Sequence, residues 1–172
     1  LGVFNLDEAT DLSEELPLPP VKRNDPIVAQ DFIPPKATFA VWKDLQLNGC
    51  NAFRFHWGGD EPLTYLRNNS DLPDLLQPEK EGFSNLCFLL GCSNWTLAGN
   101  AYMNPWIHLQ TTSQNFKSVP LGTTIISEMV IKEFYEKKGH EFIDVDVNLF
   151  DEKDDSCLMT INLVAIFKVR GS

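Results

Sequence analysis

The segment from Phe55 to Leu66, FHWGGDEPLTYL, holds the residues of this sequence that are best suited to acid–base chemistry. His56 and Asp60 lie four residues apart, with a pair of glycines between them. Imidazole and carboxylate groups are the side chains that most often move protons in enzymes. Thr64 and Tyr65 follow where a second base is expected, and neither is a base at neutral pH. The segment is either an active site with an altered pair of residues or the remains of one.

Each of these candidates also has a structural interpretation. Asp60 either acts as an acid or caps a short helix that we expect over residues 60–68. Tyr65 either donates a proton to a ligand or packs, half-buried, in the wall of the candidate site. His108 either replaces the missing base or is a structural histidine bonded to a backbone carbonyl. His140 belongs to a charged hairpin turn, and we assign it no role.

The N-terminal third divides into two parts. Six prolines in residues 1–37 predict an extended arm, because proline fixes φ and lacks a backbone donor. The domain itself is expected over residues 38–170. Alternating apolar residues over 37–57 predict strands, with Asn48-Gly49 as a turn between them. Residues 71–81 contain two prolines and predict a loop.

Residues 82–100 predict the main helix of the protein. Apolar residues recur near a spacing of 3.6, and no charged residue occurs between Glu81 and Lys117. A helix without a charged face is usually buried on most sides, so we expect a sheet to wrap around it. Asn94 and Asn100 then need partners from the protein, a second subunit or a ligand.

The C-terminal half predicts four consecutive antiparallel strands. Alternating patterns cover residues 106–116, 123–135, 142–149 and 157–169, and short turns separate them. Strands wrapped around one central helix form an α+β arrangement. Seven aromatic residues surround the candidate site and either line an acyl tunnel or pack in the core and at an interface: Phe53, Phe55, Trp57, Phe83, Phe88, Trp95 and Trp106.

Composition restricts the partners of the chain. Its 172 residues suit one domain with a real core. The formal net charge of −10 disfavours nucleic acid and anionic membrane surfaces, which need a basic patch. No apolar run approaches the length that spans a bilayer. The four cysteines lack a zinc-binding spacing, and we expect reduced, mostly buried thiols, no metal, no cofactor and a cytoplasmic location.

The order of elements resembles the hotdog fold, and two segments narrow the resemblance. GDEPLT, residues 59–64, is similar to the G-D-x-N-P-[hydrophobic]-H motif of MaoC-like hydratases. NFKSVPLGTTI, residues 115–125, is similar to the strand–turn–strand element of that family. The resemblance covers roughly residues 45–169. It implies a single hotdog domain that forms a homodimer through edge-to-edge sheet pairing and helix contacts.

The family resemblance also implies roles for individual residues. In the family the aspartate and histidine of the motif add water to a 2-enoyl thioester or remove it. Asp60 occupies the acid position, and Thr64 stands in place of the histidine, so His56, His108 or Tyr65 would have to supply the base. Backbone N–H groups at the helix start, at Gly82, Phe83 and Ser84, would polarise the thioester carbonyl. Thr64 and Asn100 complete the expected substrate-binding set.

Three functions remain open at this point. The first is a dehydratase or hydratase with an altered dyad, acting on an acyl-CoA or an acyl chain on a carrier protein. The second is a hotdog thioesterase, although the predicted helix has no acid and only Asp74, Glu79 and Glu81 lie nearby. The third is a non-catalytic hotdog subunit that binds a ligand or a partner. Residues 1–45 could also be the end of a degraded first hotdog half.

Overall fold

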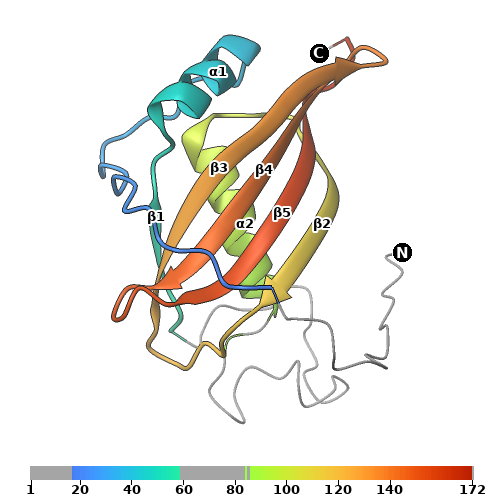
Figure 1. Cartoon of the computed structure of the whole chain (residues 1–172). Coiled ribbons are helices and arrows are strands. Elements are labelled where there is room, and N and C mark those ends of the chain that lie inside the picture. The colour runs from blue at the N-terminus through green and yellow to red at the C-terminus, as the bar shows by residue number, and fades with distance from the viewer. Residues whose placement is uncertain (1–16, 59–83, 85, 172) are drawn as a thin grey trace, which may run out of the picture.

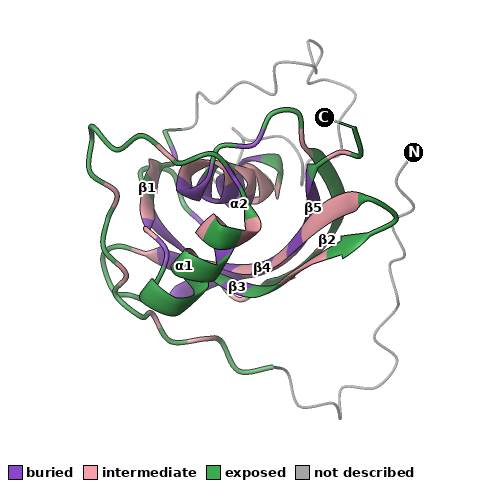
Figure 2. Ribbon diagram, turned by 90° about the horizontal axis from the view of Figure 1, so that it is seen from above, coloured by how far each residue is buried: buried purple, intermediate pink, exposed green. Residues whose placement is uncertain are grey.

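A computed structural model describes residues 17–58, 84 and 86–171 of the chain. Two helices and five strands follow the order α1 (Phe39–Asn48), β1 (Phe53–His56), α2 (Leu86–Asn100), β2 (Ile107–Asn115), β3 (Thr124–Lys137), β4 (His140–Asp151) and β5 (Cys157–Lys168). The strands form one antiparallel sheet in the order β1-β3-β4-β5-β2. The sheet curves around α2, as Figures 1 and 2 show.

The four C-terminal strands confirm the sequence prediction, with ends that differ by a few residues. Their alternation places one set of side chains against α2, on the concave face, and the other set on the convex face. Val145, Val147 and Leu149 of β4 are fully buried on the concave face, opposite Leu163, Ile161 and Met159 of β5. Asp144, Asp146 and Asn148 alternate with them on the convex face and are only partly buried.

Helix α2 supplies the other half of the core. Phe88, Leu89, Cys92, Ser93, Thr96, Leu97 and Asn100 are buried along it, at the spacing of one broad helical face. The Thr96 hydroxyl donates to the Cys92 carbonyl at 2.8 Å and lies 2.7 Å from the Ser127 hydroxyl of β3. This buried pair holds the helix to the sheet with its polar groups satisfied.

The prediction of strands over residues 37–57 is wrong for the first half of that segment, where α1 forms. Thr38 caps the helix by accepting a hydrogen bond from the Val41 backbone N–H at 3.2 Å. Trp42 is completely buried, and Phe39 packs against Phe134 and Phe167 at the end of the sheet. The apolar residues fit a helical spacing as well as an alternation, and tertiary packing selects the helix. Residues 53–56 do form a strand.

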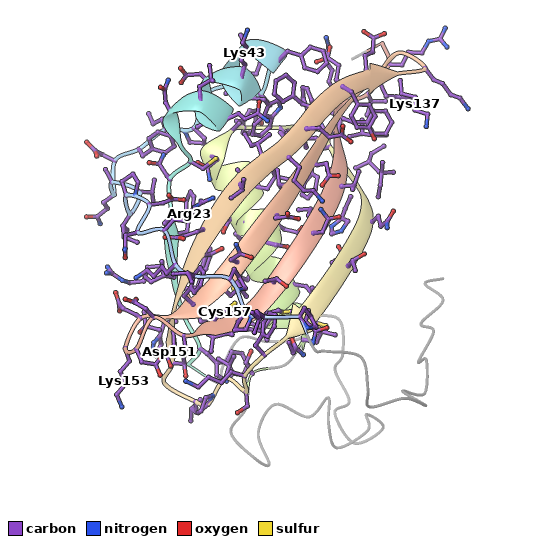
Figure 3. All side chains as sticks on the ribbon, in the orientation of Figure 1. Arg23, Lys43, Lys137, Asp151, Lys153 and Cys157 are labelled. Atoms are coloured by element: carbon purple, nitrogen blue, oxygen red, sulfur yellow. The ribbon has the colours of Figure 1, made fainter. Side chains whose placement is uncertain are left out.

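The N-terminal arm is described from Pro17 and crosses the convex face beside β3, where Figure 3 shows Arg23. The Glu128 side chain is 1% exposed and accepts hydrogen bonds from the backbone N–H groups of Arg23 at 2.8 Å and Asp25 at 2.9 Å. Further along the arm, Ile27 forms a bridge with Ala52. These contacts fasten the arm to the sheet. The division into an arm of residues 1–37 and a domain of 38–170 stays a prediction.

Candidate functional site

Different helices, strand ends and turns lie at the two ends of the sheet. At one end α2 begins, β1 and β2 finish, and the turn with Asp151 and Lys153 lies nearby (Figures 1 and 3). Ser84, just before α2, donates its backbone N–H to the Val119 carbonyl at 2.8 Å. At the other end α1 and the β3–β4 turn with Lys137 lie together (Figure 3). We call these the helix-start end and the hairpin end.

Five of the predicted site residues lie outside the described residues: Asp60, Thr64, Tyr65, Gly82 and Phe83. The roles assigned to them stay predictions. The chain leaves the described region after Gly58 and returns at Ser84. Both places are tied to the same loop, because the Trp57 backbone bonds to Gly122 and Thr123 while Ser84 bonds to Val119.

His56 ends β1 on the convex face. Phe53 and Phe55 of this strand reach α2, where Phe53 lies against Gly99 and Phe55 against Trp95. Arg54 and His56 alternate with them and are exposed on the opposite face. The His56 Nδ1 atom lies 3.4 Å from the Thr124 hydroxyl. The imidazole therefore points away from α2, on the convex side of the sheet.

A hollow of about 550 Å³ borders Thr124 at the helix-start end, and charged side chains line it. Several of its charges have partners: the Lys117 ammonium lies 2.9 Å from the Asp154 carboxylate, and Glu152 pairs with Arg54 close by. Hydrogen bonds from Ser156, followed by that from Lys117, hold the pKa of Asp154 well below its usual range. The hollow is open to solvent, and ion-paired side chains line it together with Pro120 and Leu121.

His108 is the predicted catalytic histidine that faces the α2 side of the sheet. It lies opposite Ala165 of β5, which is completely buried on the concave face, and paired residues of an antiparallel ladder share a face. Its Nε2 atom contacts the Thr111 hydroxyl in a short hydrogen bond, and its ring stacks on Trp106. Partial burial lowers the pKa of His108, while a backbone hydrogen bond to Gln110 acts in the opposite direction. This lowering of the pKa favours the neutral imidazole, which is the form that can accept a proton.

A stripe of polar residues extends from His108 along the concave face of β2. Thr111, Ser113 and Asn115 lie opposite Leu163, Ile161 and Met159, all of which belong to the core cluster. The register shifts between His108 and Gln110, so that His108 and Thr111 share a face although they are three residues apart. We call His108, Thr111, Ser113 and Asn115 the β2 stripe. The sequence analysis missed its last three members, because uninterrupted alternation would place them on the face opposite His108.

Asn100, predicted to bind substrate, is completely buried and hydrogen-bonded within the chain. Its side-chain oxygen accepts from the Asn51 backbone N–H at 2.8 Å, and its amide donates to the carbonyls of Asn51 at 3.1 Å and Thr96 at 3.0 Å. The sequence left open whether Asn100 bonds to its own chain, to a second subunit or to a ligand, and in the structure its partners belong to its own chain. These bonds give Asn100 a structural role: it holds the segment before β1 against the end of α2.

The aromatic residues near α2 form one continuous cluster. Ring contacts run from Phe53 through Phe55, Trp95 and Phe88 to Trp57, with centroids 4.9–6.4 Å apart. Trp57 is completely buried, whereas Trp95 is 49% exposed. Phe55, Trp57 and Phe88 belong to the hydrophobic core or pack against it. The cluster joins β1 to α2, and Trp95, in its middle, is its most exposed ring.

No group of three or more His, Cys, Asp or Glu side chains among residues 17–58, 84 and 86–171 is placed to hold a metal ion. No helix in the same part of the chain has the length and apolar character needed to cross a membrane. Cys50, Cys92 and Cys157 are buried and Cys87 is exposed.

Comparison with solved structures identifies the fold. A chain of the ChsH1–ChsH2 complex from Mycobacterium tuberculosis is similar with a TM-score of 0.51 and 9% sequence identity, over 69% of this chain and 94% of that one. The HadBC (3R-hydroxyacyl-ACP dehydratase) complex from the same organism has a TM-score of 0.42 and 13% identity, over 49% of this chain and 62% of that one. Thus, the match spans less than two thirds of the HadBC chain.

A third similar structure is smu.793 from Streptococcus mutans bound to acetyl CoA, with a TM-score of 0.43 and 13% identity, over 59% of this chain and 78% of that one. No protein-family model matches the sequence, and no curated protein matches it. The five-stranded antiparallel sheet around α2 and the similarity to the ChsH1–ChsH2 chain together define the class. This chain is a hotdog-fold protein.

Proposed function

We propose that this hotdog protein is an acyl-thioester hydratase or dehydratase of the MaoC-like kind, with a rearranged pair of catalytic residues. The observation that carries the proposal is the position of His108. Its imidazole faces the α2 side of the sheet, is held by the Thr111 hydroxyl and has a lowered pKa. A neutral, oriented imidazole is what the motif at residues 59–64 lacks, because Thr64 stands where that motif has its histidine.

The proposed reaction is the addition of water to a 2-enoyl thioester, or its reverse. Water bonds to C3 of the acyl chain, and the electron pair of the double bond moves toward the thioester carbonyl. His108 takes the proton that the water loses, and Asp60 gives a proton to C2. Backbone N–H groups before α2, at Gly82 and Phe83, stabilise the negative charge that develops on the thioester oxygen, whereas the Ser84 N–H already donates to the Val119 carbonyl. Solvent then returns the proton from His108 to Asp60.

The proposed assembly is a homodimer that pairs β2 with β2 of a second copy. None of the nine residues of β2 is buried, although Ile107 and Leu109 are large and apolar. An exposed strand edge of this length is normally paired, covered or protected by charges, and β2 carries no charged residue. The HadBC and ChsH1–ChsH2 structures are complexes as well.

The substrate class that we propose is an acyl-CoA. The net charge of −10 arises almost entirely from residues 1–16 and 59–83, since the described residues hold 12 Lys or Arg and 13 Asp or Glu. The described sheet and helices are therefore nearly neutral and do not by themselves repel an anionic ligand, whereas the segment 59–83, which contains Asp60, is acidic. Acyl chains on a carrier protein are the second choice.

A turnover assay on short and medium 2-enoyl-CoA and 3-hydroxyacyl-CoA thioesters tests the proposal. We expect hydration that His108→Gln and Asp60→Asn each reduce by about 10²–10⁴-fold. His56→Gln is the matched control, and we expect it to retain turnover because that ring lies on the convex face. Release of free CoA without hydration would instead indicate a thioesterase. No turnover of any thioester, with binding retained, would indicate a non-catalytic subunit.

A further inference from the structure

His108 and Thr111 form a hydrogen-bonded pair of an imidazole and a hydroxyl on β2. Residues three positions apart in a regular strand point to opposite faces, so this contact needs the register shift between His108 and Gln110. Bulges often re-aim a side chain beside an active site. Here the shift places both side chains on the concave face, where Nε2 of His108 contacts the Thr111 hydroxyl. The pair therefore depends on a specific irregularity of β2.

The second ring nitrogen of His108 determines where the proton of the pair lies. Burial lowers the pKa of the ring, and a hydrogen bond with the backbone of Gln110 opposes this by raising the pKa. A backbone carbonyl has such an effect because it accepts from a ring N–H. Thr111 occupies Nε2, so Nδ1 is the nitrogen that donates to Gln110. In the neutral ring Nε2 is then the acceptor, and the Thr111 hydroxyl donates to it.

This arrangement matches the way in which hydroxyl nucleophiles are activated. A serine or threonine hydroxyl donates to a neutral imidazole, and a third group orients the imidazole. The imidazole removes the hydroxyl proton as the oxygen attacks a carbonyl carbon. In this chain the backbone of Gln110 takes the place that a carboxylate has in such triads. The ring of Trp106 stacks on His108, with centroids 6.1 Å apart, and restricts the imidazole further.

The pair is accessible to a substrate. His108 is exposed and Thr111 is partly buried, so the hydroxyl is held on the sheet beside an imidazole that solvent reaches. Threonine is also stiff at χ1, which keeps its hydroxyl directed at the ring. His56 and Thr124 offer the same two side-chain types on the convex face, but Nδ1 lies 3.4 Å from that hydroxyl. The His108–Thr111 contact is the closer of the two.

From this geometry we propose that Thr111 is a nucleophile that takes the acyl group of a thioester, with His108 as its base. The Thr111 oxygen forms a bond to the carbonyl carbon, and the C–S bond breaks. The hydroxyl proton passes to Nε2 of His108 and then to the departing sulfur, which leaves as a thiol. Water then attacks the acyl-threonine ester, and His108 carries a proton from the water to the Thr111 oxygen as the carboxylic acid leaves. The inference rests on the proposed function only for the substrate class, an acyl thioester.

Acylation by p-nitrophenyl acetate tests the nucleophile with a probe that does not depend on the natural acyl chain. All proteins carry Cys87→Ser, so that the exposed native thiol does not react. We expect an acetyl ester on Thr111 by peptide mass spectrometry, which neutral hydroxylamine removes while it leaves acetyl groups on lysines. Thr111→Val should abolish this ester, and His108→Gln should slow its formation by about 10²–10⁴-fold. Thr111→Ser should still be acylated, because it keeps the hydroxyl.

Thr112→Val is the matched control. Thr112 lies on the same strand opposite Asn162, on the convex face, so its loss should leave acylation of Thr111 unchanged. An unmodified Thr111, or acetyl groups only on lysines or Ser113, overturns the proposal in protein that folds as wild type by circular dichroism. Equal acylation of Thr111 in His108→Gln overturns the role of His108 as the base.

The thioester panel of the turnover assay separates this inference from the hydratase proposal. Release of free CoA that Thr111→Val and His108→Gln both abolish supports the covalent route. Hydration without an acyl-threonine or release of CoA supports the hydratase proposal and overturns this inference. An acyl-threonine and release of CoA without hydration support this inference and reject the hydratase proposal. Acylation by the p-nitrophenyl ester but by no thioester overturns the thioester as the substrate of Thr111.

Discussion

The ring of Phe53 lies directly against the backbone of Gly99. A Cβ atom at position 99 would be 2.5 Å from the Cε1 and Cζ atoms of Phe53, which is closer than real contacts allow. Gly99 is therefore the position on α2 that lets β1 approach the helix. This close approach also begins the aromatic cluster that continues through Phe55 to Trp95 and Phe88.

Gly99→Ala should destabilise the fold, although alanine is the better helix former. The added methyl group must displace Phe53, and overpacking of this kind costs about 1–3 kcal/mol, more than the gain of roughly 1 kcal/mol in helix propensity. Urea unfolding measures the difference. The double variant Gly99→Ala, Phe53→Leu should recover part of the loss. A single variant as stable as wild type would contradict the tight contact.

Removing one member of the Thr96–Ser127 pair should cost more than removing both. The Thr96 hydroxyl donates to the Cys92 carbonyl, so Ser127 donates to Thr96. Thr96→Val leaves the buried Ser127 hydroxyl without its acceptor, at a cost of about 1–3 kcal/mol in unfolding free energy. Adding Ser127→Ala should restore part of this stability, and a double-mutant cycle of urea unfolding measures the coupling. Strict additivity of the two changes would mean that the pair is not formed.

The N-terminal arm should detach when Glu128 loses its carboxylate. In Glu128→Gln, one of the two carboxylate oxygens is replaced by an NH₂ group, which cannot accept a hydrogen bond. The backbone N–H of Arg23 or of Asp25 then loses its acceptor, at a cost of about 1–3 kcal/mol. Trypsin should then cleave after Lys22 or Arg23 several-fold faster, as followed by mass spectrometry. Glu133→Gln, at an exposed position of the same strand, should cleave as wild type.

The cysteines should differ in reactivity. Burial raises the pKa of Cys50 and of Cys157 to about 11, with the Arg23 charge opposing this at Cys50, so on the order of 0.1% of either thiol is ionised at pH 8. Cys87 is exposed. Iodoacetamide at pH 8 should therefore label Cys87 first in the folded protein and all four cysteines only after unfolding. Rapid labelling of Cys50 in the folded protein would contradict its burial.

The His108 imidazole should titrate below pH 6.5. Burial lowers the pKa of this group in the folded chain, so the unfolded chain binds the proton more tightly. Any stability that this shift contributes is present above pH 6.5 and decreases as the pH falls below that value. Hydration by the proposed base should likewise decline on the acid side of 6.5. NMR titration of the imidazole, assigned with His108→Gln, measures the midpoint, and a midpoint above 6.5 would contradict the lowering of its pKa by burial.

The fold was largely predictable from local patterns. Period-two alternation identifies β3, β4 and β5, because one face of each strand must meet the core. The uncharged, helically spaced segment identifies α2 and the sheet around it. The same logic failed at α1, where Phe39, Val41 and Leu45 fit both a strand and a helix. The N-cap at Thr38 and the packing of Trp42 on Phe167 decide for the helix.

Patterns in the sequence are sufficient to predict a long apolar helix, antiparallel strands around it and a motif at residues 59–64 without its histidine. Tertiary structure alone decided which histidine faces the α2 side. His56 follows regular alternation and lies on the convex face, opposite Thr124. His108 lies on the concave face, and the register shift after it brings Thr111, Ser113 and Asn115 onto the same face. A bulge changes the face of every residue beyond it, and the hydrogen-bond register that creates it forms only when β2 meets β5.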